Sequence, residues 1–423
     1  MRESTTLSPR TLPGGWRLVV GVAIAAALAV VLALTSIDPW MPNIGLFAGS
    51  ADLYVYRDGG WRVAQGLPLY ATPVLLGHLY TYPPFSALLF VPVMRVPGGI
   101  VDEVWMACNV AVLVACIVQC WRILGYRADR RMFLLSVLLA LSSAFLEPVR
   151  TTLFYGQINL VLMLLVLSDF TRSRVRGVGV GIAAGIKLTP LFFVAYFAAL
   201  RQWRAAVLAG ATFAATVLVT WLVLPTDSRM FWTDKVFHST RVAPVEHPAN
   251  QSLRGLLAHL VHGEPPNWLW LLLALPATAL GLCAAVVMFR RGEELLGIAL
   301  AGLTSAAVSP FSWSHHWVWF VVLLVWLLDR AVRTPVWWLG VAAIYLPAGA
   351  WWFRWTPDWA VVGLFMGRPT WWYAQLLMNV YILVYAAILA VALYSLTRYP
   401  SAVATTSAAS RGLPQRRSQP DQC

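Results

Sequence analysis

The chain has 423 residues, of which 59% are hydrophobic and 12% are charged, a composition that excludes an ordinary water-soluble domain. Its net charge of +13 does not indicate nucleic-acid binding, because no soluble basic domain carries it and the arginines stand in short segments between apolar runs. The five cysteines exclude a disulfide framework and have no metal-binding spacing, since four lie in apolar runs and Cys423 ends a polar tail. We predict an all-α polytopic membrane protein.

The apolar runs predict about twelve transmembrane helices in one membrane domain that covers residues 18–398. The first run, Leu18–Ile37, is too long for a signal-peptide core and no small-residue cleavage site follows it, so we expect an uncleaved first span. The later runs, in chain order, are Val104–Trp121, Met132–Leu146, Ile158–Ser168, Gly177–Ile186, Pro190–Leu200, Ala205–Leu224, Trp268–Met288, Leu295–Val308, Trp317–Leu328, Val336–Trp352 and Gln375–Leu396. Two of them are too short to span alone, which predicts two half-helices that meet at Lys187.

The basic residues predict the orientation of these helices. With the N-terminus inside, the inner segments hold 20 of the 31 lysines and arginines and the outer segments hold 10, and cytoplasmic loops are the ones enriched in such residues. We therefore expect the N-terminal segment 1–17 and a disordered tail, 399–423, to be cytoplasmic. The stretch Tyr82–Val96 then lies outside, where Pro83 and Pro84 predict the start of a short interfacial helix.

Three long outer loops, 38–103, 225–267 and 353–373, are the expected place of function. The outer side holds 11 of the 18 acidic residues and all seven histidines. A cytoplasmic nucleotide-binding enzyme would have the opposite distribution, and no glycine-rich phosphate loop follows a strand. The sequence therefore favours chemistry at the outer membrane surface.

The first outer loop contains Asp52 and Asp58, six residues apart, beside Tyr56 and Arg57. Partial burial and nearby cations at a membrane surface can set the pKa of such a carboxyl group for general-base catalysis. The alternative is a solvated aspartate that caps a helix. From the residues alone, the capping role is favoured.

A second polar group, Trp313, His315 and His316, stands at an outer helix end. Adjacent histidines on a helix point about 100° apart, so they rarely bind one metal ion together. Two interpretations remain open. One histidine contacts a phosphate or a hydroxyl group, or the histidines belong to an aromatic belt at the membrane interface.

Lys187 and two pairs of amides complete the polar residues near the spans. A lysine at mid-span costs roughly 2.5 to 3.5 kcal/mol unless it is paired or reaches water, which predicts an anion or a carboxylate beside it. The amide pairs are Gln157 with Asn159 and Asn250 with Gln251. Amides suit sugar hydroxyl groups because they both donate and accept hydrogen bonds, and helix capping is the alternative.

Six short motifs follow one another along the chain. They are Asp52-Leu53-x-Val55-Tyr56, Tyr82-Pro83-Pro84-Phe85, Gly156-Gln157-Ile158-Asn159, Lys187-Leu188-Thr189-Pro190, Asn250-Gln251-Ser252-Leu253 and Ser309-Pro310-x-Ser312-Trp313-x-His315-His316. Each is weak alone, but six in order resemble the polyprenol-phosphate-mannose-dependent α-mannosyltransferases of actinobacterial envelope assembly, which have the GT-C fold. The segment Pro13–Leu18 and the variant Tyr56-Arg57-Asp58-Gly59 look most like the members that add the fifth, α-1,2-linked mannose to phosphatidylinositol mannosides.

This resemblance implies a GT-C fold with a general base at Asp52, or alternatively at Asp58, and it reverses the preference for capping. It also implies that His316 takes part in catalysis. The residues implied to surround the donor phosphate and the acceptor are Tyr56, Arg57, Gln157, Asn159, Lys187, Asn250, Gln251, Trp313 and His315. The implied partners are a polyprenyl phosphate mannose donor, a glycolipid acceptor and membrane lipids, with the site on the outer face of the plasma membrane.

The implied reaction is a single displacement that inverts the anomeric carbon. No cofactor or metal is expected, because a monophosphate leaving group carries less charge than a nucleoside diphosphate and a His, Lys or Arg side chain can stabilise it. Two alternatives remain open: a GT-C transferase for another sugar or a lipoglycan acceptor, and a lipid or solute transporter with broken helices beside Lys187.

Overall fold

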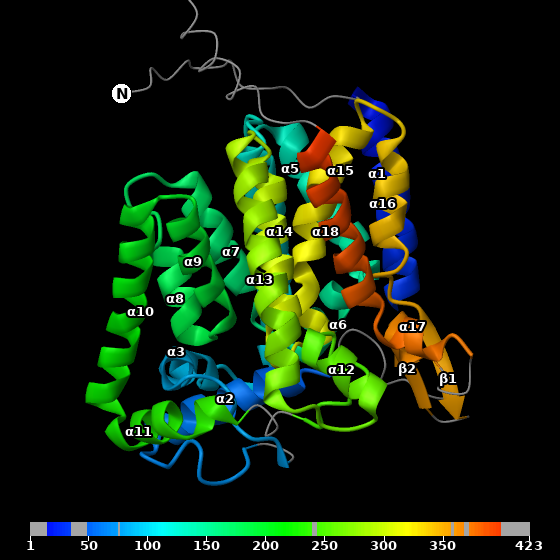
Figure 1. The fold of residues 1–423 in the computed structure, drawn as a ribbon. Coiled ribbons are helices and arrows are strands. Elements are labelled where there is room, and N and C mark those ends of the chain that lie inside the picture. The colour runs from blue at the N-terminus through cyan, green and yellow to red at the C-terminus, as the bar shows by residue number, and fades with distance from the viewer. Residues whose placement is uncertain are drawn as a thin grey trace, which may run out of the picture.

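The computed structural model describes residues 15–34, 49–74, 77–238, 243–356, 359–367 and 372–398. Within these ranges the chain is mainly helical, as predicted, and its helices stand side by side in one bundle (Figure 1). Of the predicted N-terminal segment 1–17 only residues 15–17 are described, and the predicted tail 399–423 lies outside the described residues.

Most of the predicted apolar runs contain a helix that follows the length of the bundle. These helices are α1 Gly15–Leu34, α4 Gly98–Ile123, α5 Arg130–Ser142, α7 Asn159–Thr171, α10 Trp203–Val223, α13 Asn267–Arg290, α14 Glu294–Val308, α15 Trp319–Ala331, α16 Trp337–Tyr345 and α18 Val380–Arg398. Among the described residues, α4, α10 and α13 are long and apolar enough to cross a membrane, and the bent pair of α6 (Glu147–Tyr155) and α7 would make a fourth span. The apolar helices fit a membrane protein, and the number of twelve crossings stays a prediction.

The two short helices predicted beside Lys187 are present. α8 (Val178–Ile186) ends at this lysine, whose backbone is extended, and the 3-10 helix η4 (Thr189–Leu191) leads into α9 (Phe192–Ala199). Pro190 has no N–H to continue the hydrogen-bond ladder of α8, and it is tolerated in the first turn of the next helix. Lys187 therefore lies at a junction of helix ends instead of on a helix face.

Short elements cross the lower end of the bundle in Figure 1. α2 (Ala51–Ala64) packs against α3 (Pro84–Met94), and α11 (Pro225–Thr233) and α12 (Leu253–Val261) lie at the same end. α3 begins at the predicted proline pair, because Pro84 occupies the first turn, where the helix needs no N–H. Ser252 caps α12, since its hydroxyl oxygen accepts the N–H of Gly255 at 3.0 Å.

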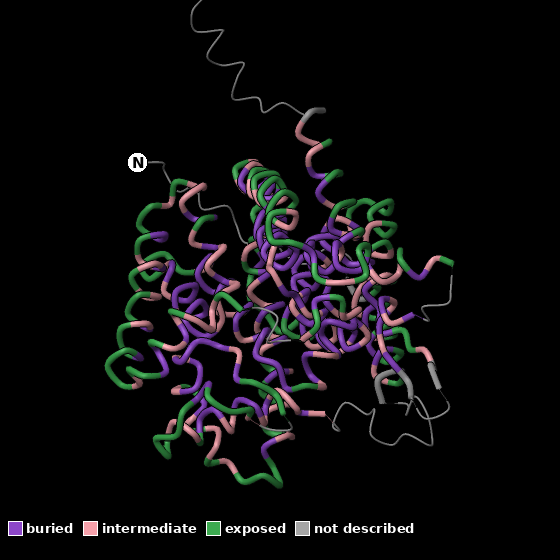
Figure 2. Tube along the Cα trace, turned by 60° about the horizontal axis from the view of Figure 1, so that its bottom comes forward, coloured by how far each residue is buried: buried purple, intermediate pink, exposed green. Residues whose placement is uncertain are grey.

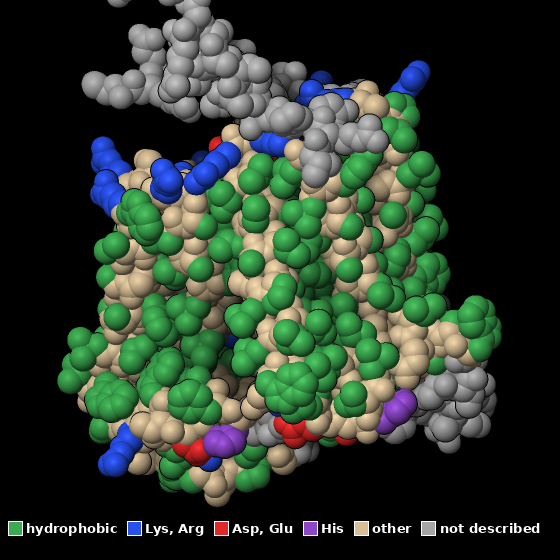
Figure 3. All heavy atoms as spheres, in the orientation of Figure 1, with side chains coloured by type: hydrophobic (Ala, Val, Ile, Leu, Met, Phe, Trp, Pro, Cys, Tyr) green, Lys and Arg blue, Asp and Glu red, His purple; other side chains and the backbone are tan. Residues whose placement is uncertain are grey.

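Polar and apolar side chains are separated along the bundle. Figure 3 shows Lys and Arg gathered at the upper end, hydrophobic side chains along the sides, and Asp, Glu and His at the lower end. Figure 2 shows the buried residues inside the bundle and the exposed ones at its periphery. α14 and α15 supply much of the core, because they are buried along most of their length.

The structure departs from the all-helical prediction in the run Val336–Trp352. α16 ends at Tyr345, and β1 (Trp352–Thr356) then pairs antiparallel with β2 (Trp359–Val362). Pro347 cannot continue α16. The backbone beyond it bonds to the segment before α6, where the Glu147 N–H donates to the Ala348 carbonyl at 2.7 Å and the Ala350 N–H donates to the Phe145 carbonyl at 2.6 Å.

The last predicted run, Gln375–Leu396, is also divided. It contains the short helix α17 (Ala374–Met378) and α18, with Asn379 between them. The Asn379 amide bonds to the Gln375 carbonyl and to the His259 ring, so its side chain competes with the regular helical pattern at this point.

Candidate active site

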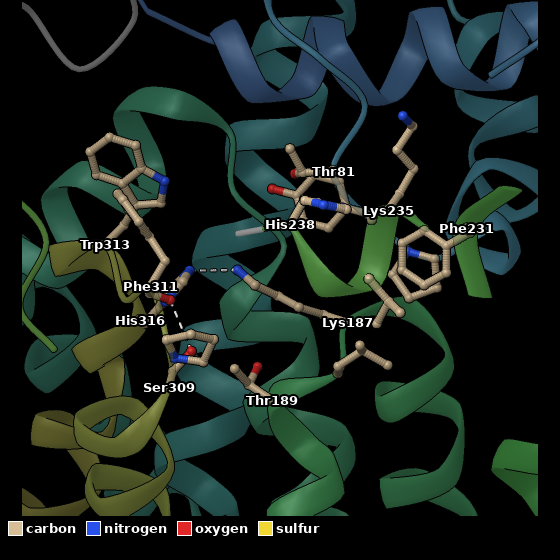
Figure 4. A pocket seen from close by; sticks show the side chains of 15 residues that line it. Thr81, Lys187, Thr189, Phe231, Lys235, His238, Ser309, Phe311, Trp313 and His316 are labelled. Carbon is tan, nitrogen blue, oxygen red and sulfur yellow. Dashed lines mark hydrogen bonds between the residues drawn. The ribbon is translucent and has the colours of Figure 1, made fainter. Parts of the chain in front are cut away.

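Two neighbouring cavities lie where the short elements of the lower end meet the bundle. The larger has a volume of about 470 Å³ and is lined by α2, α6, the segment around Thr81, the chain after Trp313, and the end of β2. The smaller has a volume of about 170 Å³ and contains Lys187 and His316 (Figure 4). Thr81, Tyr82 and Trp313 line both cavities. A molecule in one cavity would therefore be next to a molecule in the other.

Asp52 lines the larger cavity from the first turn of α2. Burial raises the pKa of its carboxyl group from 3.8 to about 6, while a hydrogen bond from Gln157 and the charges of Lys187 and His78 act in the opposite direction. A carboxyl group with this pKa is mainly ionised at neutral pH and remains basic enough to take a proton. Asp52 thus has the accessibility and the basicity that a general base needs.

Gln157 holds the Asp52 carboxylate. The Tyr56 hydroxyl donates to Gln157 Oε1 at 2.9 Å, and Gln157 Nε2 lies 3.3 Å from the Tyr82 hydroxyl. Because its oxygen already accepts from Tyr56, the amide turns its NH₂ group toward Asp52. Tyr56 is fully buried, is stacked on Phe90 with ring centroids 4.4 Å apart, and lines neither cavity. Of these two predicted binding residues, Gln157 faces the larger cavity and Tyr56 orients it.

Lys187, Asn159 and His316 form one cluster. Lys187 Nζ donates to Asn159 Oδ1 at 3.0 Å and lies 2.7 Å from His316 Nε2, and His316 Nδ1 lies 3.2 Å from the Ser312 hydroxyl. Figure 4 shows the lysine and histidine side chains pointing at each other in the smaller cavity. An ammonium group has three N–H donors. Two are used by Asn159 and His316, and the described residues supply no third hydrogen-bond acceptor, so one N–H is left for a ligand. The Tyr82 ring also faces the ammonium group, with its centroid 5.6 Å from Nζ.

Trp313 lies at the boundary of the two cavities, and His315 lines the larger one. His315 is 4% exposed and lines the larger cavity, and its Nε2 atom has no hydrogen-bond partner among the described residues. Trp313 lines both cavities and packs against His247 and Phe311, with ring centroids 5.1 and 4.9 Å away. A buried ring nitrogen without a partner is costly unless a ligand or water meets it. His315 is therefore positioned to bind a hydroxyl group.

Asp58 and Arg57 point away from both cavities. Asp58 accepts from Arg62 Nε at 2.9 Å on the same helix. Arg57 donates to the backbone carbonyls of Met94 and Val96, at the end of α3, at 3.4 and 2.9 Å. Neither residue lines a cavity. Of the two aspartates considered as the general base, Asp52 lines the space where a substrate would bind and Asp58 does not.

Asn250 and Gln251 are buried behind the cavity wall and line neither cavity. Asn250 Oδ1 accepts the Ser312 N–H at 3.1 Å, and the Gln251 N–H donates to the Ser312 carbonyl at 2.7 Å. Gln251 Oε1 also accepts the Tyr381 N–H at 3.1 Å. These amides attach the segment that carries His315 and His316 to α12 and α18, which is a positioning role.

Several cavity residues were not predicted as site residues. Glu147 lines the larger cavity and accepts the hydroxyl groups of Thr151, Ser314 and Tyr381 at 2.6, 2.7 and 2.7 Å. The others are His78, Arg150, Tyr155 and His247 in the larger cavity and Lys235 and His238 in the smaller one. In the sequence, Glu147 and Arg150 are charged residues at the edge of an apolar run, but neither belongs to one of the six motifs.

Among the described residues, no group of three or more His, Cys, Asp or Glu side chains is arranged to hold a metal ion. The cations of the site are side chains. Lys187 and Lys235 both line the smaller cavity, and Lys235 pairs with Asp234 at 2.8 Å.

Comparison with known proteins gives the family. Residues 80–310 match the model of glycosyltransferase family 87. A curated relative from Mycolicibacterium smegmatis, the polyprenol-phosphate-mannose-dependent α-(1-2)-phosphatidylinositol pentamannoside mannosyltransferase, is 32% identical over 363 residues, which cover 81% of this chain and 85% of the relative. The protein of that name from Mycobacterium tuberculosis is 32% identical over 73% of each chain.

A further relative from M. tuberculosis, the polyprenol-phosphate-mannose-dependent α-(1-2)-phosphatidylinositol mannoside mannosyltransferase, is 32% identical over 72% of this chain and 76% of its own length. No solved structure matches the chain. The resemblance predicted from the six motifs is confirmed. Since the family match covers more than half of the sequence and the relatives cover most of it, the chain belongs to glycosyltransferase family 87.

Proposed function

We propose that the protein transfers mannose from polyprenyl phosphate mannose to a phosphatidylinositol mannoside and forms an α-1,2 linkage. The observation that carries this proposal is the pair of adjoining cavities, one with the Asp52 carboxylate and the other with Lys187 and His316. A base for an acceptor hydroxyl and a cationic site for a phosphate thus lie on two sides of Tyr82 and Trp313. The names of the relatives supply the donor and the class of acceptor.

The donor phosphate is assigned to the smaller cavity. The free N–H of Lys187 binds one phosphate oxygen, and Asn159 and His316 hold the ammonium group in place. A charge-assisted hydrogen bond of this kind grows stronger as negative charge develops on the leaving phosphate. The surface is hollowed beside this part of the bundle, between α9 and α13 (Figure 3), which gives a polyprenyl chain a way out to the side.

The acceptor sugar is assigned to the larger cavity. Asp52 takes the proton of its 2-hydroxyl group, the freed oxygen attacks the anomeric carbon from the face opposite the phosphate, and the new C–O bond forms as the bond to the phosphate oxygen breaks. The electron pair of the broken bond leaves with polyprenyl phosphate, so a β-linked donor gives an α-linked product. His315 Nε2 and Arg150 contribute donors for the neighbouring hydroxyl groups.

The proposed setting is the plasma membrane, with a GT-C fold of about twelve crossings, both termini in the cytoplasm and both cavities on the outer face. The apolar helices support it, and so does the gathering of Lys and Arg at the end of the bundle opposite the cavities (Figure 3). Two lipid-linked substrates would then reach the site from the membrane itself.

A product assay tests the proposal. The purified protein is incubated with polyprenyl phosphate mannose and defined phosphatidylinositol mannosides, and the products are analysed by mass and by linkage. We expect the addition of one hexose with release of polyprenyl phosphate, and α-1,2 linkage of the new mannose. Transfer of a different sugar from its polyprenyl phosphate, or no transfer at all by a folded protein, would overturn it.

A further inference from the structure

A third cavity lies in a different part of the molecule. It is an apolar groove of about 410 Å³ between α1, which packs on α5, and α16, which packs on α15. Figure 1 shows α1 and α16 side by side at the right of the bundle. The groove shares no lining residue with the two cavities assigned to the substrates. It is therefore a separate site.

The walls of the groove consist mainly of apolar side chains. Leu18, Val22, Leu324, Leu328 and Val341 line it. Its three hydroxyl groups are bonded to the backbone, since the Ser142 and Ser143 hydroxyls both donate to the Leu139 carbonyl and the Tyr345 hydroxyl donates to the Ser142 carbonyl. A roomy apolar site whose polar groups are satisfied does not hold ordered water. It suits an acyl chain.

Small residues of α1 keep the groove open. Gly21 and Ala25 line it, and a Cβ atom built on Gly21 meets nothing within 4 Å. Val20, Ile24 and Leu28 lie on a more exposed side of the same helix, where they are 54, 58 and 60% exposed. The helix thus presents bulky side chains outward and leaves room next to α16.

One end of the groove is basic. Arg17 lines it, and it has no hydrogen-bond or ion-pair partner among the described residues. α5, which packs on α1, begins with the exposed Arg130 and Arg131, also without such partners in the described part of the chain. α1 and α5 reach the upper end of the bundle in Figure 1, the end where Lys and Arg gather in Figure 3. An acyl chain in the groove would leave its headgroup near these three arginines.

We propose that this groove binds one acyl chain of an anionic phospholipid and that Arg17 binds the headgroup phosphate. The apolar walls select a hydrocarbon chain, and the positive charge at the mouth selects a headgroup of net negative charge. Each Lys or Arg side chain near a membrane surface favours an anionic lipid about five-fold. Because this basic end lies opposite the catalytic cavities, the lipid belongs to the opposite leaflet.

The test uses the full-length protein, purified in mild detergent and analysed by native mass spectrometry with added phosphatidylglycerol or phosphatidylcholine. We expect one tightly held lipid per chain and a preference for phosphatidylglycerol of about five-fold or more. Gly21→Phe fills the groove and should abolish that binding. Gly210→Phe is the matched control, because Gly210 on α10 also has nothing within 4 Å of an added Cβ and does not line the groove.

Arg17→Gln changes only the mouth of the groove. It should keep a bound lipid but lower the preference for phosphatidylglycerol about five-fold, since Arg130 and Arg131 remain. This variant stays informative even where Gly21→Phe fails to fold. Equal binding of both lipids by the unchanged protein, or lipid retention by Gly21→Phe equal to that of Gly210→Phe, would refute the proposal. Lipid counting does not depend on mannose transfer, so its result is independent of the proposed activity.

Discussion

At the scale of single residues, the environment of Asp52 determines how activity depends on pH. Its pKa of about 6 means that activity should fall as the pH drops through 6, because the protonated carboxyl group cannot accept a proton. Gln157 stabilises the ionised form, so Gln157→Leu should raise this pKa and move the acid limb of the kcat/KM profile to higher pH. Tyr56→Phe removes the hydroxyl group that fixes the orientation of the Gln157 amide. It should also move the acid limb to higher pH, but by less than Gln157→Leu.

The measurement is the rate of mannose transfer from pH 4.5 to 8 for each variant. If Gln157→Leu lowered the maximum of kcat/KM but left the acid limb of its pH profile near pH 6, Gln157 would bind substrate and would not position the base.

Lys187 is the residue on which donor binding should depend most. Lys187→Gln removes the charge but keeps a side chain that can bond to Asn159 and His316. Loss of one charged hydrogen bond costs about 1.5 to 3 kcal/mol, so we expect kcat/KM for the donor to fall about 10- to 150-fold. Arg229→Gln, an exposed cation on α11 outside both cavities, is the control and should change it little. Equal effects of the two substitutions would contradict the assignment.

At the scale of elements, the segment that carries His315 and His316 depends on α12 for its position. Asn250 bonds to this segment, and Gly255 of α12 lies so close that an added Cβ would be 2.1 Å from the Asn250 carbonyl oxygen. Gly255→Ala should therefore displace Asn250 and lower the melting temperature by several degrees, as expected for a clash in a packed region. Gly263→Ala is the control, because an added Cβ there meets nothing within 4 Å, and it should leave the melting temperature unchanged. Thermal unfolding of both variants in detergent decides the point.

Elements also show what the sequence can and cannot predict. The apolar runs predicted the long helices and the helix break at Lys187, because run length and proline positions depend on local chemistry. The pairing of β1 with β2 was missed, because residues 353–373 were assigned to an outer loop and the strand preference of their apolar and aromatic residues depends on the surrounding fold.

The sequence predicted only part of the candidate site, because the direction of a side chain also depends on the fold. The motifs contain Asp52, Gln157, Lys187 and His316, which line the two cavities, and Asn159, which bonds to Lys187 without lining either cavity. They also contain Asn250 and Gln251, which lie behind the wall. A sequence gives the chemistry of an amide but not the direction in which it points. Glu147 and Arg150 were missed because only the fold brings them to the cavity that Asp52 lines.

At the scale of the whole molecule, the account requires that the two ends of the bundle face opposite sides of the membrane. In a background without native cysteines, Thr226→Cys at the exposed start of α11 should react with an impermeant thiol reagent in cells stripped of their outer barrier. Ser173→Cys, exposed at the basic end, should react only after lysis. The reverse pattern would place the cavities in the cytoplasm and exclude the proposed outer-face reaction.

The central claim is that Asp52 is the general base and Asp58 is not, since only Asp52 faces the larger cavity. The most direct test compares mannose transfer by Asp52→Asn and Asp58→Asn at matched protein levels, with donor binding measured separately. Asp52→Asn keeps the shape and hydrogen bonds of the side chain but cannot accept the proton, so turnover should fall by about 10² to 10⁴ while donor binding persists. Asp58→Asn loses only a partly exposed ion pair with Arg62, worth about 0 to 1 kcal/mol, and should stay active. An active Asp52→Asn beside an inactive Asp58→Asn would contradict the account.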